Sequence, residues 1–242
     1  MSRNTLIELT DVAVYQPDDE FSKFSYDNST QVLSDVNLSV GSGEMVYFIG
    51  KVGSGKSSLL KLLYAELPLV EGKARVLGFD LAALRRKDIP ALRRKMGIVF
   101  QDYQLLRDRS VFENLRFVMR ATGWKDELKI KSRAEELLVL VGLEGRGAKM
   151  PYELSGGEQQ RLVIARALIN EPEVIIADEP TGNLDPKSAD DIMKLFQSIV
   201  ERGCSVIMAT HNVQLIGRYP ARTYMFRKGR MVLVESDKLA NL

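Results

Sequence analysis

Residues 50–57 read Gly-Lys-Val-Gly-Ser-Gly-Lys-Ser and follow the apolar run from Met45 to Ile49. They fit the pattern G-x-x-x-x-G-K-[ST], and a helical run from Ser57 to Leu63 comes next, so the order is strand, loop, helix. Glycines let such a loop wrap around an anion with its N–H groups pointing inward, and the helix adds the positive end of its dipole. A plain glycine turn before a helix is the alternative, and the full pattern in this place argues against it. We therefore predict a phosphate-binding loop in an α/β core.

The polar side chains of this loop indicate a nucleotide with a divalent cation. We expect Lys56 to reach the β- and γ-phosphates. We expect the Ser57 hydroxyl to bind Mg²⁺, a hard cation that takes few protein ligands beside phosphate oxygens and water. The residues predicted to contact the nucleotide here are Gly50, Lys51, Val52, Gly53, Ser54, Gly55, Lys56, Ser57 and Ser58.

Two adjacent carboxylates, Asp178 and Glu179, end the apolar run that starts at Val174. Such a pair is unfavourable after a buried strand unless it has a partner. At the carboxyl end of a parallel strand beside the phosphate loop, Asp178 would hold Mg²⁺ through its water shell and Glu179 would polarise the attacking water. The alternative is a surface Asp-Glu pair after a core strand, and the phosphate loop makes that reading weaker.

The remaining elements predict the fold class. Runs from Leu6 to Tyr15 and from Val32 to Val40 indicate an antiparallel β-layer, whereas the segment from about residue 102 to residue 169 has helical periodicity. Strand, helix and strand return after Pro172. We predict an α/β fold: a P-loop NTPase core with a parallel sheet, an N-terminal antiparallel β-layer and an inserted helical subdomain. One domain is expected over residues 1–242, with its core at about 1–101 and 170–242 and the helical subdomain at about 102–169.

Composition limits the partners and the compartment. Lys and Arg number 34 against 32 Asp and Glu, a net charge of +2 that is too balanced for nucleic acid or anionic lipid as a bulk partner. No nucleic acid is therefore expected. The single cysteine fits a reducing compartment, and no run approaches the roughly 18 apolar residues of a membrane span. We expect a chain that reaches a membrane only through a partner.

A second glycine-containing motif, Leu-Ser-Gly-Gly-Glu-Gln-Gln-Arg, occupies residues 154–161. Ser155 and Glu158 form an S-x-x-E capping box that opens a helix from Gln159 to Asn170, with exposed N–H groups at its start. An ordinary capped helix is the alternative reading. The two consecutive glycines, Gly156 and Gly157, allow a ligand to approach closely and favour a second anion site.

These motifs together resemble the ATP-binding-cassette ATPases, whose signature sequence matches residues 154–161 at every position. The resemblance covers nearly the whole chain and implies ATP hydrolysis with Mg²⁺. It implies that Ser155, Gly156, Gly157 and Glu158 contact the nucleotide of a second copy, which makes a homodimer. It also implies the roles of four further residues: Gln101 contacts Mg²⁺ or water, Asp185 crosses the dimer interface, His211 contacts the γ-phosphate, and Tyr15 stacks on adenine.

One feature departs from the family pattern. Tyr15 lies one position earlier than the aromatic residue of the family, and a polar loop with Phe21, Phe24 and Tyr26 follows it. The family also places a groove for a transmembrane partner near Gln101. Tyr103, Leu105, Leu106 and Phe112 are candidates to line that groove, and packing in the core is the other interpretation of the same side chains.

The motif around Asp178–Asp185 resembles the branch of the family that contains the FtsE, LolD and MacB ATPases. Residues 100–111 most resemble the FtsE-like members, which serve cell division. This implies an FtsX-like permease as partner and a location on the cytoplasmic face of the inner membrane. A LolD- or MacB-like role in lipoprotein release or export stays open, and a DNA-repair or translation-factor ATPase is the alternative of another class.

Overall fold

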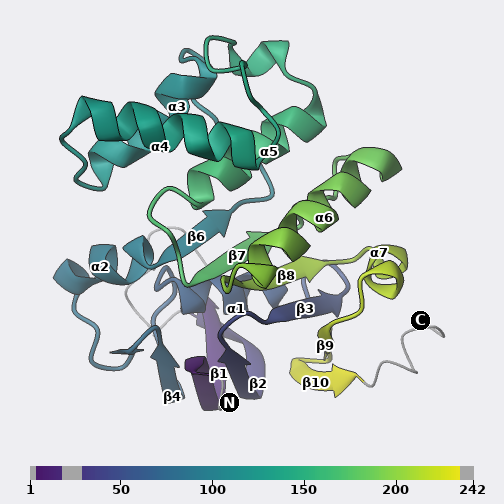
Figure 1. Cartoon of the computed structure of the whole chain (residues 1–242). Helices are drawn as coiled ribbons and strands as arrows, with labels where there is room; N and C mark the ends of the chain where they lie inside the picture. The colour runs from purple at the N-terminus through teal and green to yellow at the C-terminus, as the bar shows by residue number, and fades with distance from the viewer. Residues whose placement is uncertain (1–3, 18–28, 235–242) are drawn as a thin grey trace.

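The computed structural model describes residues 4–17 and 29–234, and Figure 1 shows two sheets with a group of helices to one side of them. The larger sheet has six strands in the order β10-β9-β3-β8-β7-β6, of which all but β10 run parallel to their neighbours. Its central strands are buried on both faces, as is usual for parallel sheets. The strands are β3 (Met45–Gly50), β6 (Met96–Val99), β7 (Val174–Asp178), β8 (Ser205–Thr210), β9 (Arg222–Arg227) and β10 (Arg230–Val234).

The smaller sheet is antiparallel and has the order β2-β1-β4-β5, which confirms the predicted N-terminal β-layer. Helix α1 (Lys56–Leu63) packs between the two sheets, because four of its leucines join one apolar cluster with both. The helix that follows the phosphate loop is thereby fixed on two sides. The strands are β1 (Thr5–Pro17), β2 (Ser29–Gly41), β4 (Glu71–Val76) and β5 (Phe79–Asp80).

The other face of the six-stranded sheet carries the remaining large helices. Helix α5 packs against β6 closely enough that a Cβ on Gly97 would lie 2.7 Å from the Ala167 carbonyl oxygen. Helices α3 and α4 pack on α5 and stand away from the sheets in Figure 1. The helices are α2 (Ile89–Arg94), α3 (Val111–Ala121), α4 (Glu127–Leu140), α5 (Gly156–Ala167), α6 (Pro186–Glu201) and α7 (Val213–Arg218), with single 3₁₀ turns at Arg86–Asp88 and Pro151–Glu153.

Buried Asn114 of α3 holds the chain that leads from β6 into these helices. Its Oδ1 accepts from the Leu106 N–H at 2.8 Å, and its Nδ2 donates to the carbonyls of Leu106, Arg109 and Ser110. The segment between Leu106 and Ser110 has no regular structure, so these bonds replace those of a helix or strand. Among the described helices, none is long and apolar enough to cross a membrane.

Candidate active site

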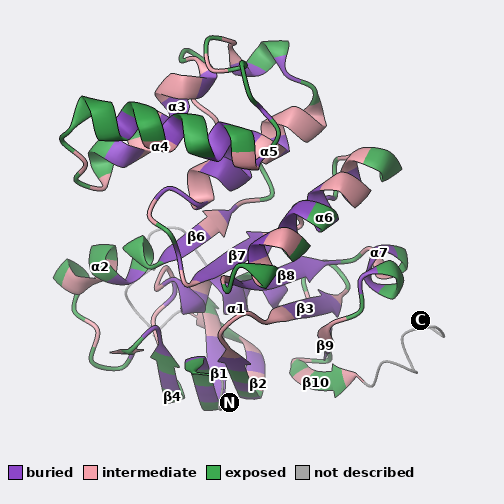
Figure 2. Cartoon of the chain, viewed as in Figure 1, coloured by how far each residue is buried: buried purple, intermediate pink, exposed green. Residues whose placement is uncertain are grey.

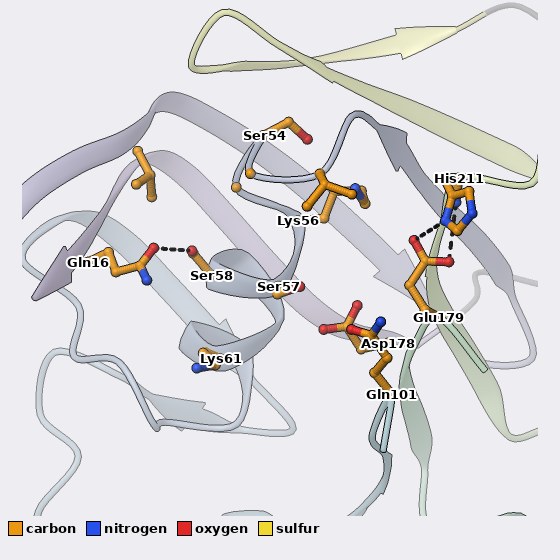
Figure 3. A pocket seen from close by; sticks show the side chains of 14 residues that line it. Gln16, Ser54, Lys56, Ser57, Ser58, Lys61, Gln101, Asp178, Glu179 and His211 are labelled. Carbon is orange, nitrogen blue, oxygen red and sulfur yellow. Dashed lines mark hydrogen bonds and ion pairs between the residues drawn. The ribbon is translucent and has the colours of Figure 1, made fainter. Parts of the chain in front are cut away.

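A pocket of about 250 Å³ opens where strands β3, β7 and β8 end at their carboxyl termini. This is the edge at which open parallel sheets usually bind ligands. Figure 3 shows the phosphate loop and α1 on one side of it and the ends of β7 and β8 on the other. The lining residues are Gln16, Val32, Val52, Gly53, Ser54, Gly55, Lys56, Ser57, Ser58, Lys61, Gln101, Asp178, Glu179 and His211.

The loop keeps its shape through glycines in positions that no other residue fits. Gly55 has a φ of 99°, and a Cβ there would lie 2.8 Å from the Leu33 side chain. Gly50 has a φ of 149°, and its Cβ would lie 2.6 Å from the Phe226 carbonyl oxygen. The close approach of β2 and β9 to the loop therefore requires glycine at both places.

Lys56 lies back across the loop that precedes it. Its Nζ donates to the carbonyls of Gly50 at 2.8 Å and Lys51 at 3.1 Å, and the residue is 6% exposed. Gly50 and Lys51 do not line the pocket. Their backbone carbonyl groups instead accept the hydrogen bonds of Lys56. Among the described residues the hydrogen bonds of Lys56 go to neutral carbonyls, so this nearly buried ammonium has unused capacity for an anion.

Asp178 faces this cation from the end of β7. Burial raises the pKa of its carboxyl group, and the Ser57 hydroxyl bond and the nearby Lys56 partly oppose that rise, whereas Glu179 adds to it. Ser57, Asp178 and Gln101 all line the pocket and offer hydroxyl, carboxylate and amide oxygens. These hard oxygen donors are the kind that Mg²⁺ prefers, so the donor set fits that ion.

Glu179 and His211 form the far wall of the pocket. His211 Nδ1 lies 2.9 Å from Glu179 Oε1, and the His211 backbone N–H donates to Oε2 at 3.4 Å. Glu179 has a positive φ of 47°, and its own N–H donates to the Ala209 carbonyl in β8. The two strand ends are thus tied together, and the strained backbone points the carboxylate into the pocket.

The five residues predicted to act across a dimer, Ser155, Gly156, Gly157, Glu158 and Asp185, lie outside the pocket of this single chain. Ser155 caps α5 by accepting from the Glu158 N–H, and Glu158 Oε2 accepts from the Ser155 N–H at 2.9 Å, so the predicted capping box is present. That backbone bond lowers the pKa of the Glu158 carboxyl group. Asp185 caps α6 through the N–H groups of Lys187 and Ser188, each at 3.0 Å. The remaining two of the five are Gly156 and Gly157, in the first turn of α5.

A second hollow of about 570 Å³ adjoins the pocket at Gln101, which lines both. Tyr103 and Leu105 line it and also pack against the apolar cluster of the larger sheet, which confirms the core packing, whereas their part in a groove for a partner stays a prediction. Phe112 packs against that cluster and is not among the residues that line the hollow. The lining residues are Gln101, Asp102, Tyr103, Gln104, Leu105, Arg107, Pro151, Tyr152, Gln159 and Asn183.

Tyr15 does not line the pocket, and its neighbour Gln16 does. The Tyr15 hydroxyl donates to Glu71 Oε1 in β4 at 2.6 Å. Reasoning from the sequence missed Gln16, although the alternation of side chains along a strand places it on the face opposite Tyr15. It also missed Val32 and Lys61. The aromatic residues of the polar loop after Tyr15, namely Phe21, Phe24 and Tyr26, lie outside the described residues.

Comparisons with known proteins agree with this geometry. The ABC transporter family model matches residues 33–182. The cell division ATP-binding protein FtsE of Streptococcus pneumoniae strain D39 is 46% identical over 211 residues, which are 87% of this chain and 91% of that protein. FtsE of Bacillus subtilis is 42% identical over 88% of this chain and 92% of that protein, and FtsE of Escherichia coli K12 is 39% identical over 86% and 93%.

Solved structures agree with the ABC cassette family. CbiO1 from Clostridium perfringens, part of the ABC transporter complex CbiONQ, superposes with a TM-score of 0.85 at 29% identity over 98% of this chain and 91% of that chain. The ATP-binding cassette MJ0796, a dimeric post-hydrolysis state bound to ADP and Pi, gives 0.81 at 30% identity over 95% and 98%. The chain belongs to the ABC transporter ATPases, as an FtsE-like subunit that binds and hydrolyses ATP.

Proposed function

We propose that this chain is the ATPase of a cell-division complex, in which ATP-driven motion passes to an FtsX-like transmembrane permease that controls cell-wall hydrolysis. The observation that carries the proposal is the identity of 39–46% with FtsE proteins over most of both chains. Such a subunit lies at the cytoplasmic face of the inner membrane and is held there by its partner.

The pocket supplies the groups that phosphoryl transfer to water requires. The phosphates bind along the loop, where the N–H groups and Lys56 compensate their charge. Ser57, Asp178 and Gln101 would hold Mg²⁺, which would neutralise charge on the phosphate oxygens. Glu179 takes a proton from water as the water oxygen attacks the γ-phosphorus and the bond to ADP breaks.

His211 keeps Glu179 in place for this step. Its Nδ1 and its backbone N–H approach the two carboxylate oxygens of Glu179, so the carboxylate cannot rotate freely. The imidazole is the more exposed of the pair, with 62% of its side chain accessible against 11% for Glu179. It therefore lies at the pocket mouth, where a γ-phosphate would meet it.

A homodimer completes the site. Within one chain the signature residues Ser155–Glu158 lie outside the pocket, although the start of α5 offers free N–H groups suited to an anion. We infer that this turn closes over the nucleotide of a second copy in a head-to-tail arrangement, with Asp185 at the interface. The solved structures of the related cassette MJ0796 are dimeric, which supports the formation of a dimer.

The hollow beside Gln101 suits a cytoplasmic helix of the permease. It shares Gln101 with the nucleotide pocket, so a change at the nucleotide reaches both cavities. Closing and opening of the dimer would then move the docked helix.

Depletion of the chain in its own cells tests the cellular role. Failure of septation with correctly sorted lipoproteins is the expected result. Mislocalised lipoproteins with normal septa would instead indicate the LolD- or MacB-like role, which uses the same catalytic residues. Purification of the chain from cells should recover a membrane protein, and recovery of DNA or ribosomes in its place would contradict the proposal.

A further inference from the structure

The pocket has two distinct ends. Figure 3 shows Glu179 and His211 at one end and Gln16 with Ser58 at the other, with Lys56 and Ser57 between them. Since water must attack the γ-phosphate beside Glu179, the chain of phosphates leads away from that residue along the loop. The nucleoside therefore lies toward Gln16, Ser58 and Val32.

A β-bulge on β2 lies beside the residue of β1 that lines this end of the pocket. Val14 pairs with Leu33 and Tyr15 pairs with Gln31, so Val32 is an extra residue on β2 with no partner of its own across the ladder. Bulges of this kind redirect side chains beside active sites. Here Val32 and Gln16 line the pocket, whereas Tyr15 lies against Glu71 of β4.

The Gln16 carboxamide is positioned by α1. Ser58 is buried and lies in the first turn of that helix, and its hydroxyl donates to Gln16 Oε1 at 3.3 Å. With its oxygen engaged in this way, the amide offers the N–H donors of Nε2 to a ligand. Ribose and purine both carry acceptor atoms that such donors can bind.

We propose that the Gln16 amide, oriented by Ser58, binds the nucleoside by hydrogen bonding and that no ring of β1 stacks on the base. The inference rests on the proposed use of this pocket for nucleotide hydrolysis. Since no Phe, Tyr or Trp among the described residues lines the pocket, we expect affinity to come mainly from the phosphates, with little preference between adenine and guanine among purine nucleoside triphosphates. The chain is expected to hydrolyse GTP as well as ATP.

Steady-state kinetics of the full chain test this with ATP and GTP, and with tripolyphosphate as a competitor that has no nucleoside. We expect kcat/KM values for the two nucleotides within about fivefold of each other. Gln16→Ala should raise KM for both by about two- to tenfold, the loss of one hydrogen bond, with kcat and tripolyphosphate inhibition nearly unchanged. Gln16→Tyr should lower KM for both by about fivefold or more, since base stacking is favourable for any base.

Two further variants make the test specific. Gln31→Ala removes a glutamine of the neighbouring strand that does not line the pocket, and it should leave both KM values unchanged. Tyr15→Leu removes the nearby ring and should also leave them unchanged. A preference for ATP of about fiftyfold or more, or a large rise in KM for Tyr15→Leu with none for Gln16→Ala, would overturn the inference. These outcomes test only how the base is recognised. If the proposed cellular role were wrong, the ratio of ATP to GTP turnover would not change.

Discussion

At the scale of single residues, the site contains charged groups in buried positions, which is unfavourable for the stability of the fold. Lys56 is almost buried and donates its hydrogen bonds to two carbonyl groups, and Asp178 has a carboxyl pKa that burial raises although Lys56 lies near it. Burial of a charged group is unfavourable unless an opposite charge compensates it. Bound phosphates and Mg²⁺ would supply the missing partners. The nucleotide-free chain is therefore less stable at this site than it could be, as is common where activity requires strained or desolvated groups.

Asp178→Asn should stabilise the nucleotide-free chain. The amide removes the desolvated negative charge and can still accept from the Ser57 hydroxyl, so we expect a gain of about 1 kcal/mol in the free energy of unfolding at neutral pH. The same change removes an Mg²⁺ ligand, so ATP with Mg²⁺ should raise the melting temperature less than in the unmodified chain. Thermal unfolding with and without the nucleotide measures both effects. A lower melting temperature without nucleotide would contradict the argument.

Glu179→Gln should separate binding from hydrolysis. The amide keeps the size of the side chain and can remain beside His211, but it cannot take the proton from water. We expect the ATPase rate to fall by about 10²- to 10⁴-fold while ATP affinity changes little. Glu173→Gln is the matched control, because Glu173 precedes the same strand and pairs with Lys95 on the surface. Turnover near the normal rate in Glu179→Gln would remove this residue from its proposed role.

At the scale of elements, helix α5 connects the signature turn to the segment after Gln101. Arg166 lies in its last turn, and its guanidinium donates to the carbonyls of Tyr103 at 3.0 Å and Gln104 at 2.6 Å. Gln104 has a positive φ of 48°, so this segment needs external support. Any shift of α5 therefore moves the residues that line the hollow beside Gln101.

Replacing Arg166 should weaken that connection. Arg166→Ala leaves two carbonyls without their charged donor, and we expect a loss of about 2 kcal/mol of unfolding free energy. Because Arg166 does not touch the nucleotide pocket, kcat should fall more than KM for ATP rises. Arg166→Lys should recover part of the lost unfolding free energy and part of the lost kcat, since one ammonium can donate well to one of the two carbonyls. Chemical denaturation and ATPase kinetics test this, and equal kcat values in all three chains would leave Arg166 with a structural role only.

At the scale of the whole molecule, the pocket and the signature turn belong to different parts of one chain, and a second copy is proposed to bring them together. The Ser155 side chain is the group to alter, because aspartate and asparagine both replace serine well as N-caps. Ser155→Asp adds a negative charge where the γ-phosphate of the other copy is expected, whereas Ser155→Asn adds none.

In the Glu179→Gln background with ATP, we expect the mass by light scattering to double. Ser155→Asp should prevent the doubling by charge repulsion and leave ATP binding to the single chain intact. Ser155→Asn should reduce it far less. Dimers that form equally well in both variants would place the signature turn away from the phosphate of the second copy.

Local sequence determined much of this protein. The loop from Gly50 to Ser57, the carboxylates at the end of β7 and the capping box of α5 each depend on neighbouring residues, so their patterns are readable without a structure. The α/β fold with its antiparallel layer follows from the same local periodicities, and the comparisons and the structure bear it out.

Tertiary structure decided the rest, because those features depend on how distant segments pair. The way β1 is placed beside α1 puts Gln16 rather than Tyr15 at the pocket, and the ladder between β1 and β2 has register shifts, one of them at Val32, that local sequence does not reveal. The bonds of Asn114 and Arg166 join residues whose closeness arises only when the helices pack. A side chain's type is fixed by the sequence, but the partner it meets is fixed by the packing of the whole chain.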